Sequence, residues 1–186
     1  MDLLSRWFDT AFMSRPGCFL AWPAAAMLVG TFLQMFGGAA TQALGIIPRS
    51  LSGLLGIVSA PFMHVNFAHF FANLPPFLVL SWLVLLHGET VFLEVALGTA
   101  LVGGFLVWLL ARRASHMGMS GVIFGLLGFL LCVAWRTQVS SDLLIAGGVL
   151  LFYGGMLGGV APARNGSSWE AHLFGLLVGG GLVWVL

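Results

Sequence analysis

The sparsity of charged residues is the feature that most limits how this chain can fold. No charged side chain occurs between Arg15 and Arg49, or between Arg49 and Glu89. Of the 186 residues, 60% are hydrophobic and only 7% are charged, whereas a soluble domain carries about a quarter charged residues. Such a chain cannot cover a water-facing surface, so lipid must be the solvent for most of it. We therefore predict a multi-pass integral membrane protein.

Apolar stretches define the expected architecture, because a helix that crosses a bilayer needs about 20 residues. Reading between the arginines, glycines and prolines gives six candidate helices: 18–38, 67–87, 91–111, 119–136, 143–160 and 169–186. The connections between most of them are short. We therefore expect residues 1–186 to form a single all-α domain, a bundle of six transmembrane helices.

Two segments fall outside these spans. Residues 1–17 form a short N-terminal segment of mixed charge, and the apolar run after it lacks a clear cleavage site, so we expect that run to be retained. Residues 39–66 are too interrupted by Gly, Pro and Arg49 to span the membrane, yet too apolar for a solvated loop. We predict that this segment is a membrane-interfacial loop.

Glycines are concentrated in two of the predicted spans. The chain has 26 glycines, and the fourth and sixth spans contain Gly121, Gly125, Gly128, Gly175 and Gly179. In lipid, small residues allow helix backbones to approach closely and so supply the packing between helices. We therefore expect the fourth and sixth spans to lie against each other.

Polar side chains gather at the beginnings of three even-numbered spans. They are His64, His69 and Asn73 at the second span, Ser120 at the fourth and His172 at the sixth. Even-numbered spans all enter the bilayer from the same side, so these side chains are expected at a similar depth near one membrane face. Ionisable residues inside a membrane are costly and usually functional. Their shared depth predicts a site built from all three helices.

A serine at the start of a helix lies among unpaired backbone N–H groups and near the positive end of the helix dipole. Its hydroxyl needs a base to become a good nucleophile, and His172 on a neighbouring helix is the candidate. Glu170 is two residues from His172 and so points to nearly the opposite face of the helix. We therefore predict a Ser120–His172 dyad without a carboxylate, in which the Phe124 ring holds the imidazole.

The other polar side chains expected at this depth could stabilise a reacting carbonyl group. His69 and Asn73 are four residues apart, which places them on one helix face, where they can donate hydrogen bonds to an oxyanion. His64 precedes that helix and is expected in a supporting role. Gly118 and Gly121 flank the serine and leave room for a substrate backbone.

Other interpretations of the same residues remain open. Each polar residue alone can be a packing or interhelical hydrogen-bonding residue, and His87 and His116 are expected at the membrane interface. Four histidines offer an alternative metal site: His64, His69, His116 and His172. The His-Glu-x-x-His pattern is missing, however, which favours the serine interpretation and no metal. A net charge of +1 without a clustered basic patch argues against a nucleic-acid partner.

Together these motifs resemble a known family. His-x4-His-x3-Asn at 64–73, Gly-x-Ser-Gly at 118–121 and Ala-His-x2-Gly-x3-Gly at 171–179 resemble the rhomboid family of intramembrane serine proteases, in its minimal six-helix bacterial form. The resemblance implies that Ser120 is the nucleophile and His172 the general base. It also implies an oxyanion hole built from His69, Asn73 and the Ser120 backbone N–H.

The resemblance further implies what the protein acts on and where. Rhomboid proteases need no cofactor and cleave transmembrane segments of other membrane proteins, which enter sideways past the fifth helix. A bacterial plasma membrane with the active site near its extracytoplasmic face is implied. The Trp-Arg pair of the family's first loop is absent here, and Arg49 is the candidate replacement. A catalytically silent rhomboid-like protein that binds membrane helices is the alternative, and a small transporter is a weaker one.

Overall fold

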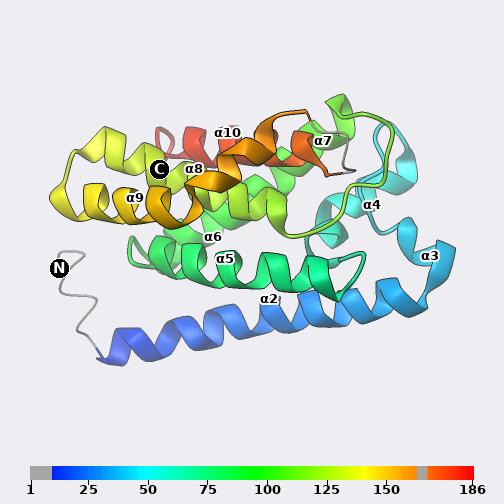
Figure 1. Ribbon diagram of the computed structural model, residues 1–186, viewed down its shortest axis with the longest axis horizontal. Coiled ribbons are helices and arrows are strands. Elements are labelled where there is room, and N and C mark those ends of the chain that lie inside the picture. Colours follow the sequence, from blue (N-terminus) through cyan, green and yellow to red (C-terminus); the bar gives the residue numbers. More distant parts are fainter. Residues whose placement is uncertain (1–9, 163–166) are drawn as a thin grey trace.

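The computed structural model describes residues 10–162 and 167–186 as a bundle of helices joined by short loops (Figure 1). Its longer helices are α2 (Thr10–Phe36), α5 (Phe67–Leu85), α8 (Ser120–Thr137), α9 (Ser140–Tyr153) and α10 (Trp169–Leu182). Helices α6 (Glu89–Gly98) and α7 (Gly104–Leu110) continue one another through a π-helical turn, η2 (Thr99–Gly103). The short helices are α3 (Gly38–Gln42), α4 (Leu51–Ser59), η1 (Ala60–Phe62) and η3 (Gly154–Val160).

Within the described ranges, five helical segments are long and apolar enough to cross a membrane. They are Phe19–Phe36, Phe67–Leu85, Glu89–Leu110, Ser120–Thr137 and Ser140–Val160. These segments overlap the first five predicted spans, so the prediction of a helical membrane bundle is confirmed.

The sixth predicted span, 169–186, is shorter than expected. Helix α10 has 14 residues, which corresponds to about 21 Å at the α-helical rise, less than the roughly 30 Å of a bilayer's hydrocarbon core. Three consecutive glycines, 179–181, lie in its last turns, where they weaken the helix. Beyond Leu182 the chain continues in turns, so α10 alone does not cover a full span.

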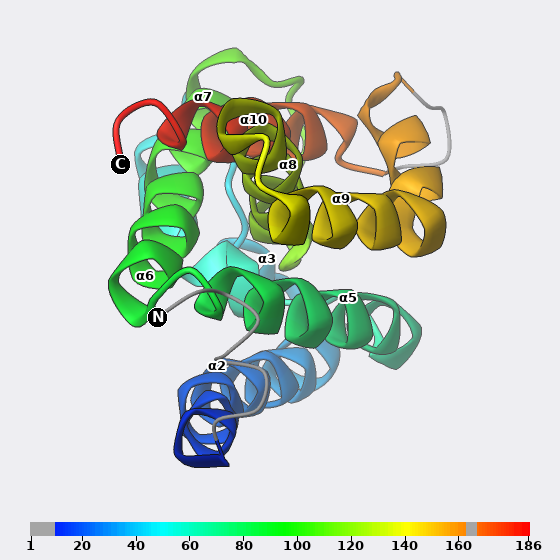
Figure 2. The ribbon, with the colours of Figure 1, turned by 90° about the vertical axis from the view of Figure 1, so that its left-hand side faces the viewer.

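Helix α8 lies at the centre of the bundle. An end-on view shows it among α5, α6, α9 and α10, while α2 lies outside against α5 (Figure 2). Residues 122–130 of α8 are all buried, as expected for a helix that is apolar on every side. Ser120 is the first residue of this central helix, and the surrounding helices therefore meet around it.

Glycines bring α8 and α10 into direct backbone contact. A Cβ at Gly175 would overlap the carbonyl oxygen of Gly121, and one at Gly179 would overlap that of Gly125. Gly128 packs in the same way on the carbonyl of Leu176. The expected contact between the fourth and sixth spans is thus confirmed, and it places the start of α10 beside Ser120.

The segment between α2 and α5 is folded rather than irregular. It contains α3, α4 and η1, and its Ile46 exchanges two backbone hydrogen bonds of 2.9 Å with His116 in the loop before α8. One side of α4 exposes Leu51, Leu55 and Val58, which are 85%, 73% and 65% exposed. An apolar outer face on a short helix fits the predicted place at the membrane interface.

Candidate active site

The hydroxyl of Ser120 faces the imidazole of His172. Ser120 Oγ lies 3.0 Å from His172 Nε2, and His172 Nδ1 lies 2.9 Å from the carbonyl oxygen of Gly159 in η3. A carbonyl oxygen can only accept a hydrogen bond, so Nδ1 must carry the proton. Nε2 is then an acceptor aimed at the serine O–H. The arrangement can therefore remove a proton from Ser120.

Neighbouring groups fix the plane of the His172 ring. The Phe124 ring, one helical turn after Ser120, stacks on it with centroids 4.3 Å apart and an interplanar angle of 6°. Gly159 lies so close that a Cβ there would be 3.1 Å from His172 Nδ1 and 3.2 Å from Phe124 Cζ. The predicted contact of Phe124 with the imidazole is present, and the ring has little freedom to turn away.

The start of α5 brings two more of the predicted residues to the same place. The Asn66 side chain caps this helix by accepting a 2.8 Å hydrogen bond from the His69 N–H. One turn later, Asn73 Nδ2 donates to the carbonyl of His69 at 2.8 Å. This pairing leaves the second amide hydrogen of Asn73 for another acceptor.

A polar cavity of about 490 Å³ connects these side chains. Its lining includes His69, Asn73, Ser120, Phe124 and His172, together with Ser115, Met117, Ser167 and Ser168. The cavity is large enough to admit a stretch of peptide, and side chains from α5, α8 and α10 meet in it. The structure therefore brings side chains from the three helices together, as the sequence predicts.

Gly118 makes the approach of His69 possible. Its φ is +115°, which a residue with a side chain rarely adopts. A Cβ at this position would lie 2.8 Å from His69 Cε1 and 2.9 Å from Nε2. At Gly121, by comparison, a Cβ would be in ordinary contact with Ala171, 3.5 Å from its carbonyl oxygen.

His64 lies behind this group and is 0% exposed. Its Nδ1 is 3.3 Å from the carbonyl of Phe62, and its Nε2 accepts a 3.4 Å hydrogen bond from the N–H of Met119. Burial, with a smaller contribution from nearby His69, lowers its pKa to about 4. The ring is therefore neutral at pH 7. It links the chain before α5 to the backbone just before Ser120.

A second polar group, not predicted from the sequence, fixes the beginning of α10. Glu170 is buried and forms a 2.9 Å ion pair with Arg112, whose Nη2 also donates to the Ser167 carbonyl. His116 Nδ1 forms a 3.1 Å hydrogen bond with the hydroxyl of Ser168, and its Nε2 lies 3.1 Å from the carbonyl oxygen of Arg112. Burial lowers the pKa of His116, although the hydrogen bond to the Arg112 carbonyl and the nearby Glu170 act in the opposite direction.

The expected place of His116 at the membrane interface stays a prediction, but the structure gives this residue a linking role, because it is buried, 2% exposed, and contacts both Ser168 and Arg112. A single histidine among small polar residues gives no sequence signal for such a role. The four histidines of the alternative metal site do not come together as ligands: within residues 10–162 and 167–186, no three His, Cys, Asp or Glu side chains gather as a metal site.

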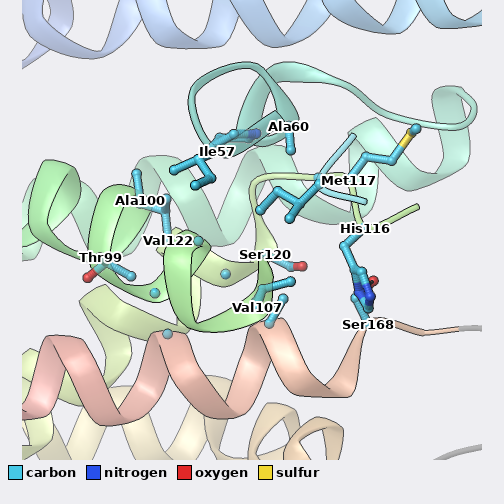
Figure 3. A pocket seen from close by; sticks show the side chains of 18 residues that line it. Ile57, Ala60, Thr99, Ala100, Val107, His116, Met117, Ser120, Val122 and Ser168 are labelled. Carbon is cyan, nitrogen blue, oxygen red and sulfur yellow. Dashed lines mark hydrogen bonds between the residues drawn. The ribbon is translucent and has the colours of Figure 1, made fainter. Parts of the chain in front are cut away.

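A small second cavity lies on the other side of Ser120. Figure 3 shows its lining, from Ser168 and His116 at one end to Thr99 at the other. The volume of this cavity is about 40 Å³. Thr99 Oγ1 is buried and has no hydrogen-bond partner among the described residues. The volume exceeds the 10–15 Å³ or so that one water requires, and the threonine hydroxyl offers it a partner.

Comparison with known proteins agrees with this arrangement. Residues 51–186 match the Rhomboid domain. Uncharacterized proteins of Mycobacterium tuberculosis (Rv1337) and Mycobacterium bovis (Mb1372) are each 34% identical over 164 residues, covering 83% of this chain and 68% of theirs. An uncharacterized protein of Mycobacterium leprae (ML1171) is 40% identical over 136 residues, 68% of this chain and 53% of its own. The chain belongs to the rhomboid family, a family of intramembrane proteases.

Proposed function

We propose that this protein is an intramembrane serine endopeptidase that uses Ser120 as nucleophile and His172 as general base. The observation that carries the proposal is the 3.0 Å contact between Ser120 Oγ and His172 Nε2, with Nδ1 bound to the Gly159 carbonyl. Nucleophile, base and orienting group follow one another at hydrogen-bonding distance, which is the arrangement that nucleophilic catalysis requires.

The reaction follows from these positions. Ser120 Oγ attacks the scissile carbonyl while its proton passes to His172 Nε2, which makes the imidazole cationic. The Gly159 carbonyl dipole keeps Nδ1 protonated and stabilises that cation, the role that a carboxylate has in a Ser-His-Asp triad. Nε2 then gives the proton to the leaving amine, and a water activated in the same way hydrolyses the acyl-enzyme.

The oxyanion formed in this step needs donors. We assign them to the backbone N–H of Ser120 at the start of α8, the ring of His69 and the free amide hydrogen of Asn73. All three residues line the cavity of about 490 Å³, so the developing charge and the nucleophile share one cavity. Such pre-positioned donors are commonly worth 10²- to 10³-fold in rate each.

The substrates in this proposal are transmembrane segments of other membrane proteins. They reach the cavity sideways from the lipid, past α9 and the η3 turn that follows it. The proposed location is a bacterial plasma membrane, with the site at its extracytoplasmic face; the mycobacterial relatives support a bacterial setting.

Cleavage of a labelled transmembrane substrate by the purified protein in detergent tests this proposal. Wild type is expected to cleave it, and Ser120→Ala to reduce cleavage to background. Ser140→Ala is the matched control, because Ser140 also begins a helix, at the start of α9, and is exposed. Equal cleavage by wild type and Ser120→Ala would reject the nucleophile. Substrate binding without cleavage by wild type would support the catalytically silent alternative.

A further inference from the structure

A third pocket, which shares Ser115 with the cavity of the dyad, is lined by two arginines. It has a volume of about 420 Å³ and lies where the segment between α2 and α5 meets the loop before α8. Its lining consists of Gln42, Ile47, Pro48, Arg49, Ser50, Arg113, Ala114 and Ser115. No carboxylate is among these residues, so the pocket carries two positive charges and suits an anion.

The guanidinium of Arg49 is held in place by the end of a helix. Its Nη1 donates to the carbonyls of Leu109 and Ala111 at 3.0 and 2.9 Å, where α7 ends. The Arg49 backbone N–H also donates to the Trp108 carbonyl at 2.9 Å. These bonds use one guanidinium nitrogen and leave the donors on the other two for a ligand.

Arg113 contributes the second charge and has a different environment from its neighbour. Arg112 is paired with Glu170 at 2.9 Å, whereas Arg113 is exposed and forms no ion pair within the described part of the chain. The hydroxyls of Ser50 and Ser115 already donate to the carbonyls of Ile47 and Gln42, so the two guanidinium groups are the free donors of the pocket, and guanidinium groups suit a phosphate.

The position of the pocket indicates which phosphate it meets. The spanning segment Glu89–Leu110 ends three residues before Arg113, so both guanidinium groups lie at the depth of lipid headgroups. Directly after Arg49 and Ser50, α4 turns Leu51, Leu55 and Val58 outward. Their spacing places them on one helix face, which forms an apolar surface next to the charged pocket.

We propose that Arg49 and Arg113 bind the phosphate of an anionic phospholipid whose acyl chains cover the outer face of α4. A lipid satisfies both halves of this surface, since its headgroup matches the two cations and its chains match the exposed leucines and valine. The bound lipid ties α4 to the end of α7 and to the loop that leads to Ser120. The proposal is independent of the proteolytic activity.

Binding to the purified protein in detergent, measured by native mass spectrometry, tests the proposal. The probes are a short-chain phosphatidylglycerol, a phosphatidylcholine with the same acyl chains, and sodium phosphate. One arginine near an anionic lipid surface is worth about 1 kcal/mol, or roughly five-fold in affinity. Phosphatidylglycerol is therefore expected to bind several-fold more tightly than phosphatidylcholine, and Arg113→Gln to weaken it about five-fold.

Three further variants make the result decisive. Arg113→Lys keeps the charge and is expected to retain most of the affinity, and Leu55→Gln is expected to weaken both lipids. Arg136→Gln is the control, because Arg136 lies at the opposite end of α8 and should leave binding unchanged. Equal binding of phosphatidylglycerol by wild type and Arg113→Gln would overturn the site. Equal affinity for the two lipids, competition by inorganic phosphate as strong as by lipid, or an unaffected Leu55→Gln would overturn the lipid assignment.

Discussion

A backbone carbonyl stands where a serine protease triad has its carboxylate. The Gly159 oxygen accepts from His172 Nδ1 at 2.9 Å, and this fixes the tautomer without placing a second charge in the membrane. An ionised carboxylate would be costly to bury in lipid. The nearest acid along the chain, Glu170, is instead engaged with Arg112. The sequence could therefore predict the dyad, but not which carbonyl would orient it.

Replacement of Gly118 by alanine is expected to abolish activity. The new Cβ would be strained by a φ of +115° and would lie 2.8 Å from the His69 ring, so the loop or the ring must move. A cleavage assay on Gly118→Ala and Gly147→Ala measures this, because a Cβ at Gly147 meets nothing within 4 Å. Wild-type activity in Gly118→Ala would contradict the role given to His69.

The buried ring of His64 is expected to make stability depend on pH. Its pKa is lowered to about 4 from 6.5, so protonation favours the unfolded state. The stabilising contribution is complete above pH 6.5 or so and is lost as the pH falls toward 4, by up to a few kcal/mol. Thermal unfolding of wild type and His64→Gln in detergent, from pH 7.5 down to 4.5, measures the difference. Parallel curves for the two proteins would contradict this assignment.

The proximity of the candidate site residues was predictable from the sequence where a residue type is rare in its surroundings. Ser120, His172, His69 and Asn73 are polar residues near the ends of apolar spans, so their shared depth could be inferred before any geometry was known. Gly159 is one of several glycines in GGMLGG, and its contribution is a main-chain oxygen. No side-chain pattern encodes that contact, which depends on how η3 folds over α10.

Among the helices, the contact between α8 and α10 sets the distance between Ser120 and His172, the proposed nucleophile and base. A Cβ at Gly175 would overlap the Gly121 carbonyl, whereas one at Gly181 meets nothing within 4 Å. Gly175→Ala is therefore expected to push the helices apart, lower the unfolding temperature and sharply reduce cleavage. Gly181→Ala, the same change on the same helix, should do neither. Equal behaviour of the two variants would show that the glycine contact does not position the site.

At the end of the bundle away from Ser120, polar side chains join α5, α8 and α9. Thr137 Oγ1 donates to Asp142 Oδ2 at 2.6 Å, and His87 Nε2 lies 3.3 Å from Asp142 Oδ1, at ion-pair distance but without hydrogen-bond geometry. Asp142 is buried and His87 is largely so. This group fixes the beginning of α9 while the other end of that helix borders the site.

A double-mutant cycle of His87→Gln and Asp142→Asn is expected to show coupling of about 1 kcal/mol or more, because the partners are in contact and shielded from water. Thermal or denaturant unfolding in detergent gives the free energies. Additive losses in the double variant would mean that the two side chains do not interact. In either case, cleavage by folded protein should change less than it does in Gly175→Ala, since the pair is distant from the dyad.

Element positions were predictable to the extent that hydropathy alone determines them. Five spans follow from length and apolarity, because lipid requires each crossing segment to be a continuous apolar helix. Helix α10 is shorter than its predicted range. Gly179 and Gly180 pack closely on α8, and three consecutive glycines at 179–181 lower the helix propensity of its last turns. The segment 39–66 was predicted as a loop and contains α4, whose glycines at 53 and 56 pack on the backbone of residues 45–47; its place at the membrane interface stays a prediction.

For the whole molecule, the proposed function depends on a central helix that begins with Ser120, the proposed nucleophile. Helix α8 is enclosed by its neighbours (Figure 2). Side chains from α5 and α10 line the cavity at its first turn. The same end of the bundle carries the arginine pocket beside α4. The cavity, the apolar outer face of α4 and the Ser120–His172 pair therefore share one end of the bundle, which suits the proposed cleavage of a segment that arrives from the lipid.

The most direct measurement is covalent labelling of the folded protein by a fluorophosphonate probe, with the modified residue identified by mass spectrometry. The account predicts labelling at Ser120 in wild type, and its loss in His172→Ala, because the imidazole must take the serine proton. Gly181→Ala should label as wild type does. Absence of label from wild-type Ser120, or undiminished labelling in His172→Ala, would contradict the central claim that this pair forms a working nucleophile and base.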